Sequence, residues 1–174
     1  MRRPLEAEHP VYYKHYIDLV KSDDIIKELS AQVIDFQELI SEISVTNENE
    51  SYAPGKWTAK EVIGHITDTE RIFACRALSF ARKDKTALPG FNENDYVYYA
   101  NFKNRTIYDL AHEFAVLRES NITLFRSFDT EALDQIGNAN GRDVSVRAIL
   151  FMLAGHAAHH MNVVKTKYLE NPSV

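Results

Sequence analysis

The chain has 174 residues, of which 45% are hydrophobic and 26% are charged, and its formal net charge is -5. This length and composition are typical of one globular domain with a sizeable core, so we expect residues 1–174 to form a single domain. No basic block is present, which argues against a nucleic-acid partner, and no apolar run approaches the roughly 20 residues of a membrane span. The N-terminus lacks the apolar core of a secretory signal and the chain has a single cysteine, Cys75, so we expect a cytoplasmic protein without disulfides.

The first strong helical pattern covers about residues 22–42. Ser22 is the expected N-cap, acidic residues follow it, and apolar residues recur with helical spacing. The apolar and aromatic segment 11–20 suggests a short helix before it. The N-terminal quarter is therefore expected to supply one long helix and one short one.

The second helix has the clearest start signal and extends to about Lys83. Thr58 and Glu61 have the spacing of a capping box, and Trp57 precedes them as an expected hydrophobic staple. The apolar stripe of this helix includes His65, which is therefore predicted to face the core.

The second half of the chain begins with a connection of about twenty residues, 84–105, rich in aromatic side chains. Connections of this length are uncommon without function or local structure, and this one could roof a pocket or simply pack. A third helix is expected from Thr106, the polar segment 138–141 breaks the chain, and a fourth helix is expected from Ser145 to about Leu169. No convincing alternating strand is present, so the sequence predicts an all-α, antiparallel four-helix bundle with a long connection between helices 2 and 3.

Three histidines have the spacing of a metal site. His156 and His160 are four residues apart on the fourth helix, so both side chains lie on one face, and His65 lies on the core stripe of the second helix. Three neutral imidazoles can bind one cation and leave positions open for water or substrate. The alternative is that these are ordinary hydrogen-bonded core histidines, and the residues alone favour neither interpretation.

Other polar residues have simpler explanations. His159 competes with His160, but the helical phase favours His160 and makes His159 a flanking residue. Glu61 could act as a general base, although its capping role is sufficient. Cys75 is about 15 Å along the helix from His65 and is interpreted as a packed thiol outside the metal site.

The remaining polar groups are expected on solvated faces. Asp68 and Glu70 could support His65, but exposed positions are the default interpretation. Arg118 could contact an anion, although a surface ion pair is favoured. Three further histidines have no partner at ligand spacing: His9, His15 and His112.

Three stretches together resemble the DinB-like superfamily of metal-binding four-helix bundles. They are Tyr52-Ala-Pro-Gly-Lys-Trp-Thr-Ala-Lys-Glu-Val-Ile-Gly-His-Ile-Thr-Asp-Thr-Glu-Arg71, Leu88-Pro-Gly-Phe-Asn-Glu-Asn-Asp-Tyr-Val97, and Val144-Ser-Val-Arg147 leading to Ala154-Gly-His-Ala-Ala-His-His160. The likeness covers nearly the whole chain from about Tyr12. One departure is visible at Phe91-Asn92-Glu93, where the family pattern favours an acid at the middle position.

The resemblance implies a divalent-metal site, zinc or nickel, with His65, His156 and His160 as ligands. Relatives with known activity are mostly S-transferases that use bacillithiol, mycothiol or glutathione, or thiol-dependent isomerases, and they are often homodimers. We therefore expect a metal-dependent thiol S-transferase that acts on small electrophiles, with a low-molecular-weight thiol as cosubstrate and a homodimeric state. A metal-dependent hydrolase and a non-catalytic, metal-stabilised bundle are the alternatives. The sequence assigns no catalytic residue beyond the three ligands.

Overall fold

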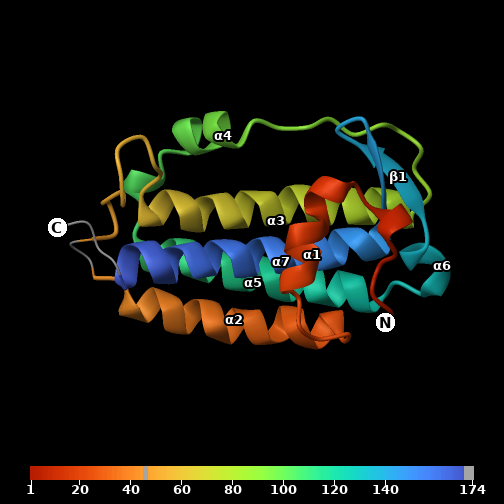
Figure 1. The fold of residues 1–174 in the computed structure, drawn as a ribbon, viewed down its shortest axis with the longest axis horizontal. Helices are drawn as coiled ribbons and strands as arrows, with labels where there is room; N and C mark the ends of the chain where they lie inside the picture. The colour runs from red at the N-terminus through yellow and green to blue at the C-terminus, as the bar shows by residue number, and fades with distance from the viewer. Residues whose placement is uncertain (45–46, 171–174) are drawn as a thin grey trace.

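Four long helices form the body of the molecule. The computed structural model describes residues 1–44 and 47–170, and the bundle consists of α2 (Ile25–Glu42), α3 (Ala59–Ala81), α5 (Ile107–Arg126) and α7 (Val146–Val164). The predicted bundle with a long connection between its second and third helices is confirmed. That connection carries the chain back along the bundle, so α3 and α5 run in the same direction (Figure 1).

The helix starts are set by side-chain caps. The predicted capping box of α3 is confirmed: Thr58 Oγ1 accepts from the Glu61 amide at 3.2 Å, and Glu61 Oε2 accepts from the Thr58 amide at 2.7 Å. α2 begins at Ile25 rather than near Ser22, because Asp24 accepts from the Lys27 amide while Ser22 accepts only from the amide of Asp24. The helix therefore starts where the second of two adjacent aspartates can cap it.

A β-hairpin stands where the sequence predicted only a break in the chain. Strands β1 (Ile136–Ala139) and β2 (Arg142–Ser145) pair antiparallel, after a one-turn helix α6 (Thr130–Leu133). Asn140 and Gly141 both have positive φ, 53° and 70°, as the tight turn of a two-residue hairpin requires. The expectation that no strand would form was wrong, because Asn-Gly is a strong hairpin signal even between strands of four residues.

The long connection has structure of its own. It contains α4 (Glu93–Ala100) and a 3-10 turn, Phe102–Asn104. Asn92, at the position where the family pattern favours an acid, caps α4 by accepting from the amides of residues 94 and 95. An aspartate could do the same, so the departure at this position keeps the local fold.

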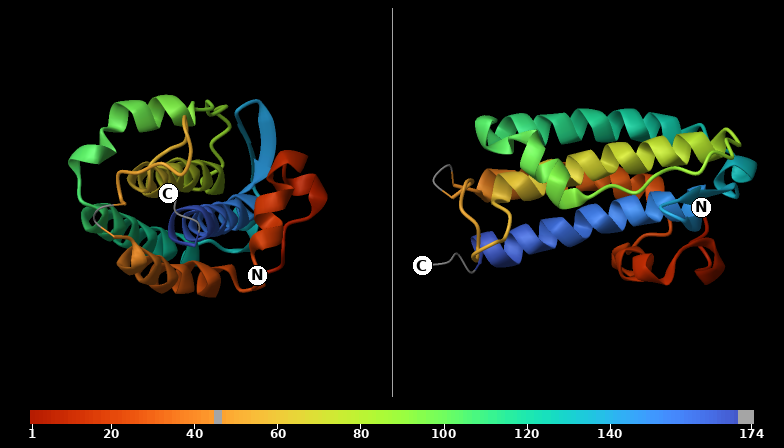
Figure 2. Two further views of the ribbon diagram at one scale, coloured as in Figure 1. Left: turned by 60° about the vertical axis from the view of Figure 1, so that its left-hand side comes forward. Right: turned by 90° about the horizontal axis from the view of Figure 1, so that it is seen from above.

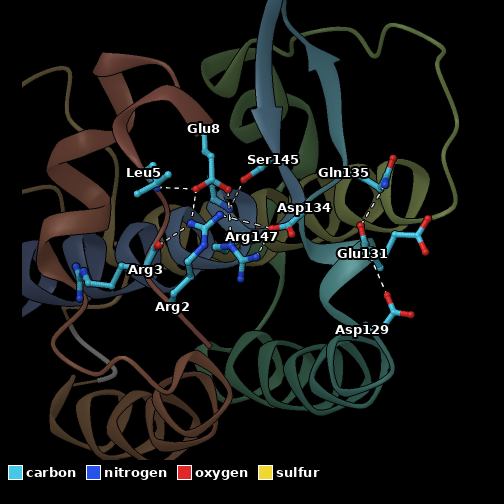
Figure 3. A network of polar contacts seen from close by, with 12 residues as sticks. Arg2, Arg3, Leu5, Glu8, Asp129, Glu131, Asp134, Gln135, Ser145 and Arg147 are labelled. Atoms are coloured by element: carbon cyan, nitrogen blue, oxygen red, sulfur yellow. Dashed lines mark hydrogen bonds and ion pairs between the residues drawn. The ribbon is translucent and has the colours of Figure 1, made fainter.

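The N-terminal segment packs against α7. It comprises two 3-10 turns, Glu6–Glu8 and Val11–Tyr13, followed by α1 (Lys14–Leu19), which confirms the predicted short helix and lies beside α7 in Figure 2. Glu8 anchors the segment: its carboxylate accepts from the Leu5 amide at 2.7 Å, forms an ion pair with Arg2, and lies 3.6 Å from Arg147 Nε (Figure 3).

A buried polar network joins all four bundle helices. Arg118 of α5 is fully buried and forms a bidentate ion pair with Glu70 of α3, at 2.8 and 2.9 Å. It also donates to Gln32 Oε1 of α2 at 2.8 Å, and Gln32 Nε2 donates to the Ala154 carbonyl of α7 at 2.9 Å. The expectations of a solvated Glu70 and a surface ion pair for Arg118 were therefore wrong: both groups are buried and satisfy each other.

Among residues 1–44 and 47–170, the structure contains no helix long and apolar enough to cross a bilayer.

Candidate metal centre

The structure brings His65, His156 and His160 together. One ligand nitrogen from each lies within 4.8 Å of the other two, and the Nε2 atoms of His65 and His156 are 3.0 Å apart. Helix α7 supplies two rings through its four-residue spacing, and α3, its most extensive neighbour in the bundle, supplies the third. Residues 91 positions apart in the chain therefore meet in one wall of the core.

Burial keeps the three rings neutral. It lowers the pKa of His65 to about 4 and that of His160 to about 3, and it lowers the pKa of His156 well below its usual value. The neighbouring imidazoles add to this depression for His156 and His160, because one protonated ring would repel the next. The lone pairs of the cluster are thus free at neutral pH.

The donor set suits a divalent cation. Nitrogen ligands at 2.0–2.1 Å in a tetrahedral site are separated by about 3.3 Å, and the Nε2 atoms of His65 and His156, 3.0 Å apart, are close to that spacing. Without a cation, the contact between His65 Nε2 and His156 Nε2 satisfies only one acceptor, whereas a cation uses both lone pairs. Three histidines could therefore hold a metal, and they would supply one ligand fewer than a closed four-ligand structural site.

The cluster opens into a cavity of about 850 Å³, within the usual range for small-molecule sites. Its walls come from the N-terminal segment, α3, the start of the long connection, the hairpin and α7. The connection that was expected either to roof a pocket or to pack does contribute to this wall. Besides the histidines, hydroxyl and charged groups on the walls include Tyr13, Tyr16, Thr69, Arg76, Glu93 and Arg142.

The competing residues lie elsewhere. His159 is half-buried beside His15 and Tyr16 and lines a second, smaller pocket. Cys75 is exposed, so its interpretation as a packed thiol was wrong. Glu61 caps α3 and does not line the main cavity.

Several cavity residues were not found by sequence reasoning. Arg76 follows His65 on the same face of α3 at an interval of eleven residues, a signal that was available in the helical phase. Tyr16, whose ring centroid is 5.5 Å from that of His156, could not have been placed, because the docking of α1 on α7 is a tertiary contact.

Fold and side chains together define a four-helix-bundle protein with a candidate three-histidine metal centre. The chain belongs to the DinB superfamily, whose family model matches residues 28–164. Its fold is similar to that of YfiT from Bacillus subtilis, described as a probable metal-dependent hydrolase with an unusual four-helix bundle topology. That similarity has a TM-score of 0.73 at 14% sequence identity and covers 94% of this chain and 90% of the other. No curated protein sequence matches the chain significantly.

Proposed function

We propose that this protein is a metal-dependent enzyme that transfers a small thiol to an electrophilic substrate, with His65, His156 and His160 as the metal ligands. The observation that carries the proposal is the convergence of three neutral imidazoles in the wall of a cavity. A bound divalent cation, zinc or nickel, would lower the pKa of a thiol at its open position and so supply a nucleophile near neutral pH.

The cavity has room for two reactants. A volume of about 850 Å³ can accommodate a low-molecular-weight thiol together with a small electrophile, so the size of the cavity is compatible with transfer.

Glu93 is suited to receive the proton of the thiol. Among the described residues that line the cavity it is the only carboxylate, and it lies close enough to His65 to oppose the effect of burial on the pKa of that ring. In the proposed reaction the thiol proton moves to a carboxylate oxygen of Glu93, the sulfur forms a bond to the electrophilic carbon, and the leaving group departs as an anion. The aromatic rings of Trp57, Tyr16 and Phe73 surround the histidines and limit access of bulk water.

A metal-dependent hydrolase is the second candidate. It is favoured by the fold similarity to YfiT, whose description names a probable metal-dependent hydrolase. In that reaction the nucleophile would be water and Glu93 would receive the proton of the water molecule.

One experiment separates these functions. Protein purified without a nickel column is analysed for metal, then assayed for conjugation of 1-chloro-2,4-dinitrobenzene to glutathione, cysteine or bacillithiol, and for hydrolysis of 4-nitrophenyl acetate without thiol. Conjugation that a chelator abolishes and added zinc or nickel restores supports the transferase. Metal-dependent hydrolysis of 4-nitrophenyl acetate, with no thiol conjugation in the first assay, supports the hydrolase. If both assays stay silent while chelation lowers the melting temperature, the metal has a structural role.

A further inference from the structure

Arg76 is a buried cation in the cavity wall that has no carboxylate partner. The residue is 6% exposed, its Nη2 donates to the Pro89 carbonyl at 2.8 Å, and its guanidinium lies 5.6 Å from the centre of the Phe73 ring. Burial lowers the pKa of this guanidinium; Tyr13 and Cys75 oppose the shift, but no carboxylate of the described chain does so. No carboxylate of the described protein therefore neutralises the positive charge of Arg76.

Every other buried cation among the described residues has an acidic partner. Burying an unpaired charge is costly, so proteins rarely retain one without a use for it. The contrast indicates that the anionic partner of Arg76 comes from a molecule outside the chain. The three paired examples are Lys60 with Glu48, Arg118 with Glu70, and Arg147 with both Glu8 and Asp134.

Thr69 gives an independent sign of a ligand in the same cavity. It is 3% exposed, and its Oγ1 is a buried polar atom with no hydrogen-bond partner in the described structure. Thr69 lies between His65 and Arg76 on one face of α3, because intervals of four and seven residues keep side chains on one helical stripe. A hydroxyl left without a partner there can bind the middle of a molecule that spans the two ends.

The dimensions of the site indicate a small ligand. The Phe73 ring is 5.6 Å from Cζ of Arg76 and 6.2 Å from the ring of His156, so guanidinium and imidazole are less than about 12 Å apart. Arg142 of the hairpin lines the same cavity, and it shares a smaller recess with Arg76. The end of the cavity near the hairpin therefore carries two positive charges.

We propose that the cavity binds a small organic anion whose carboxylate pairs with Arg76, with Thr69 hydrogen-bonding its middle and its reactive group facing the histidines. The planar guanidinium fork matches a carboxylate, and a charge-assisted pair in a cavity is stronger than one on an open surface. The assignment of the reactive end rests on the proposed function, whereas the anion subsite rests on Arg76 and Thr69 alone.

The test measures binding of dicarboxylates from succinate to suberate by isothermal titration calorimetry. One carboxylate occupies the Arg76 subsite and the other stands in for the reactive group. At least one member should bind with a Kd at or below the millimolar range, its uncharged diamide should not bind, and Arg76→Gln should weaken binding by at least about tenfold. Thr69→Val should weaken it less, because a neutral hydrogen bond is lost rather than a charged one.

Arg82→Gln is the matched control, since it removes the same charge at the end of the same helix, where the guanidinium lies over Phe128. It should leave dicarboxylate affinity unchanged. Arg76→Lys keeps the charge without the planar fork, should retain part of the affinity, and keeps the test readable if Arg76→Gln does not fold. Inorganic phosphate is titrated in parallel and should bind more weakly than the best dicarboxylate.

The inference is overturned if no dicarboxylate binds at about 10 mM, if Arg76→Gln and wild type bind alike, if Arg82→Gln weakens binding as much, or if phosphate binds more tightly than every dicarboxylate. Metal content is measured on the same samples. A wild type that takes up no metal even after dialysis against zinc or nickel, but still shows the dependence on Arg76, defeats the proposed function and leaves the anion subsite standing. A metal-loaded wild type whose dicarboxylate affinity does not depend on Arg76 overturns the anion subsite and leaves the proposed function standing.

Discussion

The backbone of Tyr16 crosses α7 directly over Gly155: a Cβ atom at this glycine would lie 1.9 Å from the Tyr16 carbonyl oxygen. The next residue of α7 is His156, whose ring contacts the ring of Tyr16. Gly64, which precedes the cluster histidine of α3, has the same role, because a Cβ there would lie 2.3 Å from the ring of Phe102. Each of the two most buried histidines of the cluster thus follows a glycine, and the absence of a side chain at that glycine leaves room for the segment that packs over the helix.

Replacing Gly155 by alanine is therefore expected to destabilise the protein. Alanine has the higher helix propensity by about 1 kcal/mol, but the clash with rigid backbone forces the N-terminal segment away from α7. The melting temperature should fall, and hydrogen exchange of the amides in residues 11–19 should accelerate. Asn162→Ala, at an exposed position of the same helix, is the control and should not lower stability. An equal or higher melting temperature for Gly155→Ala would show that the close approach is not rigid.

The histidine cluster could be predicted from sequence, because helical phase is a local property. The spacing of His156 and His160, and the place of His65 on an apolar stripe, sufficed to put all three rings in the core. The partner of each buried charge could not be predicted in this way. Arg118 and Glu70 are 48 residues apart, and a helical pattern assigns charged residues to the surface unless a partner across the bundle is known.

Sequence reasoning also missed the hairpin and the course of the N-terminal segment. The hairpin signal, Asn140-Gly141, was present but was interpreted only as a break. The segment before α2 carries no pattern that points to α7; its position depends on the small size of Gly155 and on the pairing of Glu8 with Arg147. These contacts form the cavity wall, which is why the cavity was harder to predict than its histidines.

Removing any one of His65, His156 or His160 by alanine substitution should abolish stoichiometric metal binding. Two imidazoles hold a divalent ion much less tightly than three that converge, because one of the protein ligands is lost. The measurement is elemental analysis after dialysis against zinc. His159→Ala is the matched control, because this neighbour of His160 faces His15 and Tyr16, and it should retain full metal content. Full occupancy in all three cluster variants would refute the ligand assignment.

The metal-free protein should lose stability as the pH falls below about 6.5. An unfolded imidazole titrates near that pH, whereas burial lowers the folded pKa to about 4 for His65 and about 3 for His160. Between these values the unfolded state binds more protons, so the free energy of unfolding decreases with falling pH, by up to about 1.4 kcal/mol per pH unit for each ring. Urea denaturation between about pH 7.5 and pH 5 measures the slope.

A matched pair of variants makes this pH test specific to the cluster. His65→Ala should reduce the slope, and His112→Ala, which removes an exposed histidine, should leave it unchanged. Because the folded rings are already neutral between about pH 7.5 and pH 5, saturation with zinc should raise the free energy of unfolding across this range and leave its slope nearly unchanged. A free energy of unfolding that does not vary over this pH range would mean that the rings are more accessible to solvent than their burial indicates.

The ion pair of Arg118 and Glu70 should be worth far more in a mutational cycle than a surface pair. Both side chains are almost fully buried, so Arg118→Met leaves an unpaired carboxylate in the core and is expected to cost about 3–5 kcal/mol, with a similar cost for Glu70→Gln. The double variant leaves no buried charge unpaired and should be destabilised by clearly less than the sum, which urea denaturation of the four proteins measures. The exposed pair Lys14 and Asp18 provides the contrast, because solvent screens it and its cycle should show little coupling. Additive costs for Arg118 and Glu70 would mean that hydrogen bonds to Gln32 and backbone groups, rather than the ion pair, hold the network together.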